Sequence, residues 1–152
     1  MIKKPFSKIL VPLDGSENAD KALDNALLIA EKFRSKITLI HVISDFVPEF
    51  AITPDGFAIP NTTVLEVRES INKNAETMLK QRLEKVQKNN LMVDQVIKVG
   101  DPGSEIMDFA EKNQIDLILM GARGLGTFKK LLLGSVSDKV TSHSHCPVLI
   151  VK

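Results

Sequence analysis

A short apolar run at residues 117–120 is followed at once by three closely spaced glycines, Gly121, Gly124 and Gly126. An uninterrupted apolar run of this length is typical of a strand that is buried on both faces of a parallel sheet. Because glycine has no side chain, its main-chain N–H group can approach a ligand closely. The segment therefore predicts a central strand that ends in a ligand-binding loop.

The loop leads into a predicted helix that opens near Gly134 and Ser135. Ser135 and Asp138 have the spacing of a capping box, in which a serine hydroxyl and an acidic side chain satisfy the first N–H groups of a helix. A helix start also presents unpaired N–H groups and the positive end of the helix dipole. Together, the glycines and the helix start favour the binding of a phosphate chain.

Two other phosphate-binding motifs fit the glycines less well. A Walker loop needs a lysine after its last glycine, but Gly126 is followed by Thr127. A dinucleotide-binding fingerprint that begins at Gly124 would have Lys129 in the place of its third glycine.

Composition limits the class of protein. The 152 residues carry 20 basic and 19 acidic side chains, and no basic block suggests nucleic-acid binding. The single cysteine, Cys146, fits a reducing compartment. The apolar run at 9–13 is too short for a signal peptide, and no segment approaches the length of a membrane span. We expect one cytoplasmic domain over residues 1–152, without nucleic acid or membrane as a partner.

Elsewhere, periodic apolar residues predict helices and short apolar runs predict strands. The expected strands cover 9–13, 37–42, 91–99, 117–120 and 147–151, and the expected helices cover 19–33, 64 to about 90, 102–113 and a segment from Ser135. Asp101 and Pro102 have the residue types of a helix cap and a first helical position. Strands that alternate with helices favour an α/β fold, a doubly wound parallel sheet with helices on both faces.

Residues 44–62 contain three prolines and predict a long loop without regular structure. The loop leaves the carboxyl end of the second strand, where α/β proteins bind ligands. Two interpretations stay open, a lid over the site and a disordered insertion.

The main glycine spacing is Gly121, two residues, Gly124, nine residues, Gly134 and then Ser135. This spacing resembles the nucleotide-binding motif of the universal stress protein family. The resemblance extends over the whole chain, including VPLDGS near its start and HCPVLIV near its end. It implies a doubly wound open sheet of five parallel strands in the order 3-2-1-4-5, which reverses between strands one and four.

Ligands of open α/β sheets bind outside the carboxyl ends of the strands, where the strand order reverses. That position would bring Asp14, after the first strand, beside Gly121, after the fourth. The resemblance implies an adenine nucleotide there, ATP or else AMP or ADP. The residues expected to bind it are Pro12, Leu13, Asp14, Val42, Met120, Gly121, Arg123, Gly124, Gly126, Gly134, Ser135, Val136 and Ser137.

Individual roles follow from the same resemblance. Asp14 would contact the nucleoside, and it would be the nearest carboxylate to a magnesium ion that bridges the phosphates. Its alternative role is that of a turn residue that caps the first helix. Val42 would contact adenine through its backbone, although its side chain also fits an ordinary core position.

Basic and hydroxyl side chains are the candidates for phosphate contact. Arg123 lies inside the motif and can neutralise phosphate charge, whereas Lys129 and Lys130 fit a solvated loop face. Ser135 and Ser137 would donate to phosphate oxygens, and the alternative for Ser135 is helix capping alone.

Two histidine features lead to no catalytic or metal site. His143, His145 and Cys146 lie close together in sequence, but no second half-site accompanies them, so we reject a zinc centre. His41 is expected to be held structurally rather than to act in catalysis.

The resemblance implies an ATP-binding, non-catalytic stress-response or signalling module that acts on an unidentified protein partner. The alternatives are a slow ATPase or nucleotide-dependent transferase that uses the same pocket, and an interaction module whose pocket is vestigial. The strand at 148–151 is an apolar edge that lacks the inward charge or proline that usually protects edges. By resemblance, two such strands would pair in a homodimer.

Overall fold

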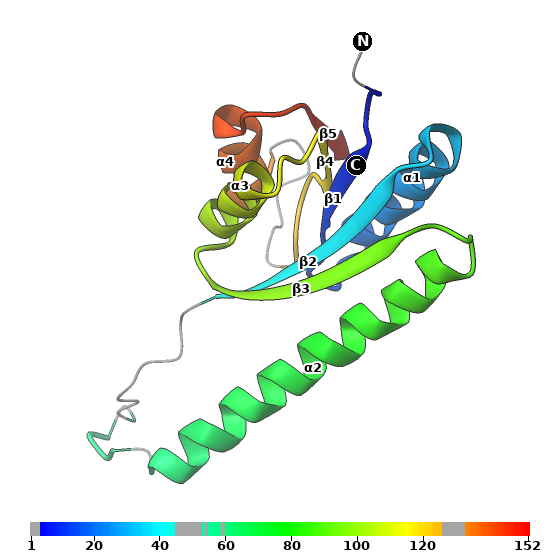
Figure 1. Cartoon of the computed structure of the whole chain (residues 1–152). Helices are drawn as coiled ribbons and strands as arrows, with labels where there is room; N and C mark the ends of the chain where they lie inside the picture. Colours follow the sequence, from blue (N-terminus) through cyan, green and yellow to red (C-terminus); the bar gives the residue numbers. More distant parts are fainter. Residues whose placement is uncertain (1–3, 45–52, 54, 59, 126–132) are drawn as a thin grey trace.

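The computed structural model describes residues 4–44, 53, 55–58, 60–125 and 133–152. Within these residues, parallel strands form a five-stranded sheet in the order β3-β2-β1-β4-β5 (Figure 1). The elements along the chain are β1 (Lys8–Pro12), α1 (Glu17–Phe33), β2 (Lys36–Ser44), α2 (Asn61–Gln87), β3 (Val93–Gly100), α3 (Pro102–Lys112), β4 (Leu117–Gly121), α4 (Ser135–His143) and β5 (Val148–Val151). The expected doubly wound sheet and its strand order are confirmed.

Each central strand divides its side chains between two cores. Ile9 and Val11 of β1 belong to a cluster with buried residues of α1 and α2, whereas Leu10 belongs to a cluster with α3 and α4. β4 alternates in the same way, with Leu119 in the first cluster and Ile118 in the second. Successive side chains of a strand point to opposite faces, so an all-apolar strand can serve two helical layers. Figure 1 shows α2 on one side of the sheet and α3 and α4 on the other.

Two helix starts have side-chain caps. The Ser16 hydroxyl accepts a hydrogen bond from the Ala19 N–H at 3.2 Å at the start of α1. At the start of α3, the Asp101 carboxylate accepts one from the Ser104 N–H at 2.9 Å, and Pro102 is the first helical residue. The predicted roles of Asp101 and Pro102 are therefore confirmed.

The predicted capping box at Ser135 is wrong. Gly134 is the N-cap of α4, has no side chain to bond, and leaves Ser135 as the first helical residue. The cause is a tertiary contact, because the Gly134 N–H donates to the Ala122 carbonyl at 2.8 Å and holds Gly134 in an extended conformation. The helix can therefore begin only at the next residue.

Helix α2 begins at Asn61, so the loop predicted for 44–62 is shorter than expected, and residues 45–52, 54 and 59 lie outside the described part. Helix α2 covers the sheet only with its carboxyl-terminal part, where Ala75, Leu79 and Val86 are buried. Nearer its start, Leu65 and Val67 are 57% and 45% exposed. A helix of 27 residues is about 40 Å long, and a strand of 8 residues spans only about 26 Å.

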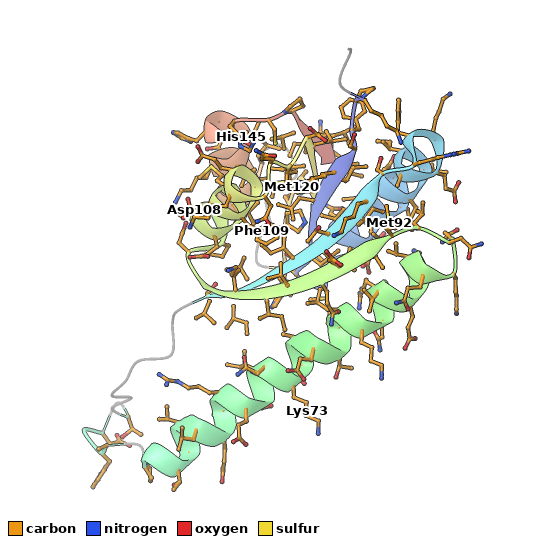
Figure 2. All side chains as sticks on the ribbon, in the orientation of Figure 1. Lys73, Met92, Asp108, Phe109, Met120 and His145 are labelled. Carbon is orange, nitrogen blue, oxygen red and sulfur yellow. The ribbon has the colours of Figure 1, made fainter. Side chains whose placement is uncertain are left out.

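The first turns of α2 therefore extend beyond the sheet (Figure 1). Figure 2 shows the labelled Lys73 pointing away from the sheet, along the solvent side of this helix. In the described part of the chain, no helix is both long and apolar enough to cross a membrane.

Helices α1 and α2 are joined by ion pairs. Arg82 of α2 donates through Nε to Asp20 Oδ1 at 3.0 Å and through Nη2 to Asp20 Oδ2 at 2.9 Å. The Arg82 side chain is 18% exposed, and the hydrogen bonds that it donates to Asp20 raise the pKa of its guanidinium. Lys85 pairs with Asp24 one turn further on, but both of these side chains are about half exposed. Bidentate, partly buried pairs are stronger than exposed single contacts.

We expect Arg82→Ala to lower the free energy of unfolding by about 1–2 kcal/mol, because it removes a bidentate pair and a packed aliphatic stem. Lys85→Ala is the matched control and should cost less than about 0.5 kcal/mol. Urea unfolding at neutral pH measures both values. Equal losses in the two variants would contradict the importance given to the Arg82–Asp20 pair.

Candidate functional site

A cavity of about 600 Å³ lies at the carboxyl ends of β1, β2 and β4 and beside the start of α4. Its volume is within the range of roughly 300–1,000 Å³ that is usual for small-molecule sites. The cavity is lined by every predicted site residue except Gly126, which is outside the described residues: Pro12, Leu13, Asp14, Val42, Met120, Gly121, Arg123, Gly124, Gly134, Ser135, Val136 and Ser137. The fold thus brings together segments that are more than 100 residues apart, and their role in binding stays a prediction.

Asp14 lies between the loops that follow β1 and β4. Its Oδ1 accepts a hydrogen bond from the Ser16 N–H at 2.9 Å, which closes a local turn. Its Oδ2 would be 2.5 Å from a Cβ atom added to Gly124, so the carboxylate lies directly over that glycine. The structure places the cap of α1 at Ser16, not at Asp14, and leaves the Asp14 carboxylate at the cavity wall.

Gly121 has a packing role in addition to its predicted ligand role. A Cβ atom at this position would be 2.8 Å from the backbone carbon of Asn18 and 2.9 Å from the Ala19 nitrogen. Only a residue without a side chain allows the end of β4 to lie this close to the first turn of α1. The glycine therefore brings the two halves of the site into contact.

The first turn of α4 forms another wall. The Ser137 side chain is 2% exposed, and its hydroxyl lies 2.7 Å from the Ala122 carbonyl and 3.0 Å from the Gly134 carbonyl. Its proton is donated inside the protein, so in this arrangement Ser137 does not offer the predicted hydroxyl contact to phosphate. The first N–H groups of an α-helix have no acceptor within the helix, so residues 135–137 can offer these instead.

Helices α3 and α4 are held together at the cavity by the Asp101 cap. Lys139 Nζ of α4 donates to Asp101 Oδ2 at 2.7 Å and lies 2.8 Å from Ser104 Oγ. The hydrogen bond from Lys139 is the main cause that lowers the pKa of Asp101 to about 2, followed by the bonds from Ser104. The ionised Asp101 carboxylate therefore links the start of α3 to Lys139 of α4.

Among the described residues, no group of three or more His, Cys, Asp or Glu side chains could hold a metal ion. His143 Nδ1 lies 3.0 Å from the Lys139 carbonyl, and burial raises the pKa of the Cys146 thiol. Lys129 and Lys130, considered as phosphate contacts, lie outside the described residues.

Several residues that line the cavity were not predicted from the sequence. Ile71 comes from α2, Pro102 and Ile106 come from α3, and His41 comes from β2. His41 and Val42 are neighbours in one strand, so His41 could have been included once Val42 was chosen. The helical residues have no local signal, because their place depends on how α2 and α3 cross the sheet.

A model of the universal stress protein family matches residues 5–152. The chain belongs to this family. It is 33% identical over 147 residues to universal stress protein YxiE of Bacillus subtilis, which covers 97% of this chain and 99% of that relative. The solved structure of universal stress protein UspA from Lactobacillus plantarum is 26% identical and superposes with a TM-score of 0.84, covering 99% of this chain and 100% of that one.

More distant universal stress proteins share the fold and have been solved with nucleotides. One, in complex with cAMP, is 22% identical with a TM-score of 0.70 and covers 97% of each chain. The protein from Archaeoglobus fulgidus, in complex with dAMP, is 22% identical with a TM-score of 0.63 and covers 100% of both chains. Likeness at this level shows the universal stress protein fold.

Two glycine variants distinguish a close contact with backbone atoms from a close contact with a side chain at this site. Gly121→Ala forces a methyl group onto the backbone of α1, where no side-chain rotation can relieve the clash, and we expect a loss of about 1–3 kcal/mol in the free energy of unfolding. Gly124→Ala meets only the Asp14 carboxylate, which can rotate away, and should change stability by less than about 0.5 kcal/mol. Urea unfolding measures both; a Gly121→Ala protein as stable as wild type would disprove the close approach.

Proposed function

We propose that this protein binds an adenine nucleotide, with ATP preferred, and acts as a nucleotide-dependent stress-response or signalling module. The observation that carries the proposal is the meeting of the Asp14 loop, Gly124 and the α4 start around a cavity of about 600 Å³. This place lies where the strand order reverses between β1 and β4. Crevices at such reversals are the usual ligand sites of open α/β sheets. The nucleotide complexes of two distant family members support the choice of ligand.

In the proposed complex, the phosphate chain lies over the glycines of the β4 loop and the first N–H groups of α4. Gly124 presents no side chain to the cavity, and the start of α4 contributes the positive end of its dipole. Arg123 lines the same wall and would add positive charge. Together these features would favour negative charge at this wall of the cavity.

The nucleoside would lie against the apolar part of the cavity lining, which includes Ile40, Val42 and Ile106. The Asp14 carboxylate, which lies over Gly124, would accept hydrogen bonds from ribose hydroxyls next to the phosphates. Magnesium binds in most nucleotide sites through one or two carboxylates together with phosphate oxygens. Asp14 fits that single-carboxylate arrangement, and the ion would neutralise phosphate charge there.

The lining of the cavity favours binding over hydrolysis. Phosphoryl transfer needs a group that orients or deprotonates the attacking water, in addition to stabilisation of charge. Among the described lining residues, Asp14 is the only carboxylate, and its Oδ1 already accepts the Ser16 N–H. A slow ATPase or transferase is therefore the alternative, and ATP occupancy as a signal is the preferred function.

Calorimetry and phosphate release test this proposal together. We expect the wild-type protein to bind ATP, and Asp14→Ala to weaken binding about tenfold through loss of a charged hydrogen-bond acceptor. Turnover should stay far below the typical enzyme value of about 10 per second, with or without magnesium. Lack of ATP binding would reject the proposed function. Multiple turnover at an ordinary rate, abolished by Gly124→Val, would instead support the ATPase.

A homodimer is the second part of the proposal. β5 is at the end of the sheet and pairs on one side with β4, and Leu149 in its middle is 37% exposed. An apolar edge strand is a template for pairing with another chain, and two copies can satisfy both edges through one self-complementary contact. An unidentified protein partner would then read the nucleotide state of this dimer.

We expect sedimentation to show a dimer at micromolar concentration, and Leu149→Lys to shift it to monomer because it places two charges at a paired apolar edge. Lys152→Ala, next to the strand, is the control and should leave the dimer intact. A wild-type monomer under these conditions would reject pairing through β5.

A further inference from the structure

His41 is the histidine of β2 and lines the cavity. Its Nδ1 lies 2.6 Å from the Leu13 carbonyl oxygen. A carbonyl oxygen can only accept a hydrogen bond, so Nδ1 must carry the proton in this contact. The imidazole is thereby held with its Nδ1–H directed at the Leu13 carbonyl.

The hydrogen bond from His41 continues the contacts between β1 and β2 beyond the last residue of β1. β1 ends at Pro12, yet the Leu13 N–H still donates to the Ile40 carbonyl at 2.8 Å. The Leu13 carbonyl, its other main-chain polar group, accepts the hydrogen bond from His41. Both main-chain groups of Leu13 are therefore bonded to neighbouring residues of β2, and Leu13 itself is 2% exposed.

The Leu13 carbonyl and the Asp14 N–H belong to one planar peptide group. A hydrogen bond that fixes the direction of this carbonyl also fixes the opposite N–H and the start of the Asp14 backbone. The Asp14 side chain then completes its contacts, with Oδ1 on the Ser16 N–H and Oδ2 over Gly124. The orientation of this one peptide thus sets the backbone direction from which the Asp14 side chain starts.

We propose that His41 is a positioning residue of the nucleotide site, whose Nδ1–H holds the Leu13–Asp14 peptide so that the Asp14 carboxylate faces the nucleoside. This inference rests on the proposed function and adds a residue through which Asp14 is oriented. His41 acts through a neighbour and needs no direct contact with the ligand. A histidine that only stabilised the fold would change unfolding but not the affinity of the folded protein.

Three substitutions at His41 test the donor position. His41→Leu removes the donor, and we expect ATP affinity, measured by calorimetry, to fall about tenfold. In His41→Asn the amide nitrogen is as many bonds from Cα as Nδ1, so this variant should recover most of the affinity. In His41→Gln the nitrogen is one bond further away, and affinity should stay as low as in His41→Leu.

His143→Leu is the matched control. Its Nδ1 lies 3.0 Å from a main-chain carbonyl, that of Lys139, but His143 does not line the cavity. The same substitution there should leave ATP affinity within about twofold of wild type. Circular dichroism and urea unfolding of each variant separate loss of fold from loss of binding, and His41→Gln replaces His41→Leu if the latter does not fold.

A double-mutant cycle tests whether His41 acts through Asp14. If it does, His41→Leu in an Asp14→Ala background should change ATP affinity by less than about twofold, because the carboxylate it orients is gone. Three outcomes would each overturn this inference without overturning the proposed function. They are additive losses in the double variant, failure of His41→Asn to recover affinity, and a His41→Leu protein that binds ATP as wild type does. A wild-type protein that does not bind ATP would overturn the proposed function, and this inference with it.

Discussion

The pairing of β1 with β2 on one side and β4 on the other is the contact on which the rest of the structure depends. β1 lies in the middle of the sheet, and Ile9, Leu10 and Val11 are completely buried. Helices α1 and α2 pack on one face and α3 and α4 on the other, as expected for right-handed parallel connections that run from β1 toward β3 and then back toward β5. The chain therefore leaves β1 and β4 in opposite directions, and a crevice opens between the two loops.

That crevice is kept narrow by close contacts across it. Gly121 lets the end of β4 lie against the first turn of α1, and the Asp14 carboxylate lies over Gly124. On the opposite wall, Gly134 and Ser137 both bond to the Ala122 carbonyl, which places the start of α4. The polar groups of the cavity are thus held by backbone contacts rather than by long side chains, which suits a site that binds without rearrangement.

Much of the fold could be predicted because its signals are local. The apolar run at 117–120 showed a strand with two buried faces, and the three- and four-residue spacing after Ala19 showed α1. Asp101 followed by Pro102 indicated a helix start for reasons of backbone chemistry alone. Prediction was wrong at Ser135, where the bond from Gly134 to Ala122 moved the cap by one residue. The overhang of α2 could not be predicted from the sequence, because it depends on where that helix crosses β3.

The sequence by itself determined the alternation of strands and helices, the glycines of the β4 loop and, by family resemblance, the residues around the cavity. Periodicity and turn chemistry are properties of neighbouring residues, so they can be read without a structure. Only the tertiary structure decided that Gly121 is needed by α1, that Ile71 and Ile106 complete the cavity, and that His41 holds the Leu13 carbonyl. Each of these depends on atoms that are far apart along the chain, and their distances are set by how the strands pair and how the helices pack on the sheet.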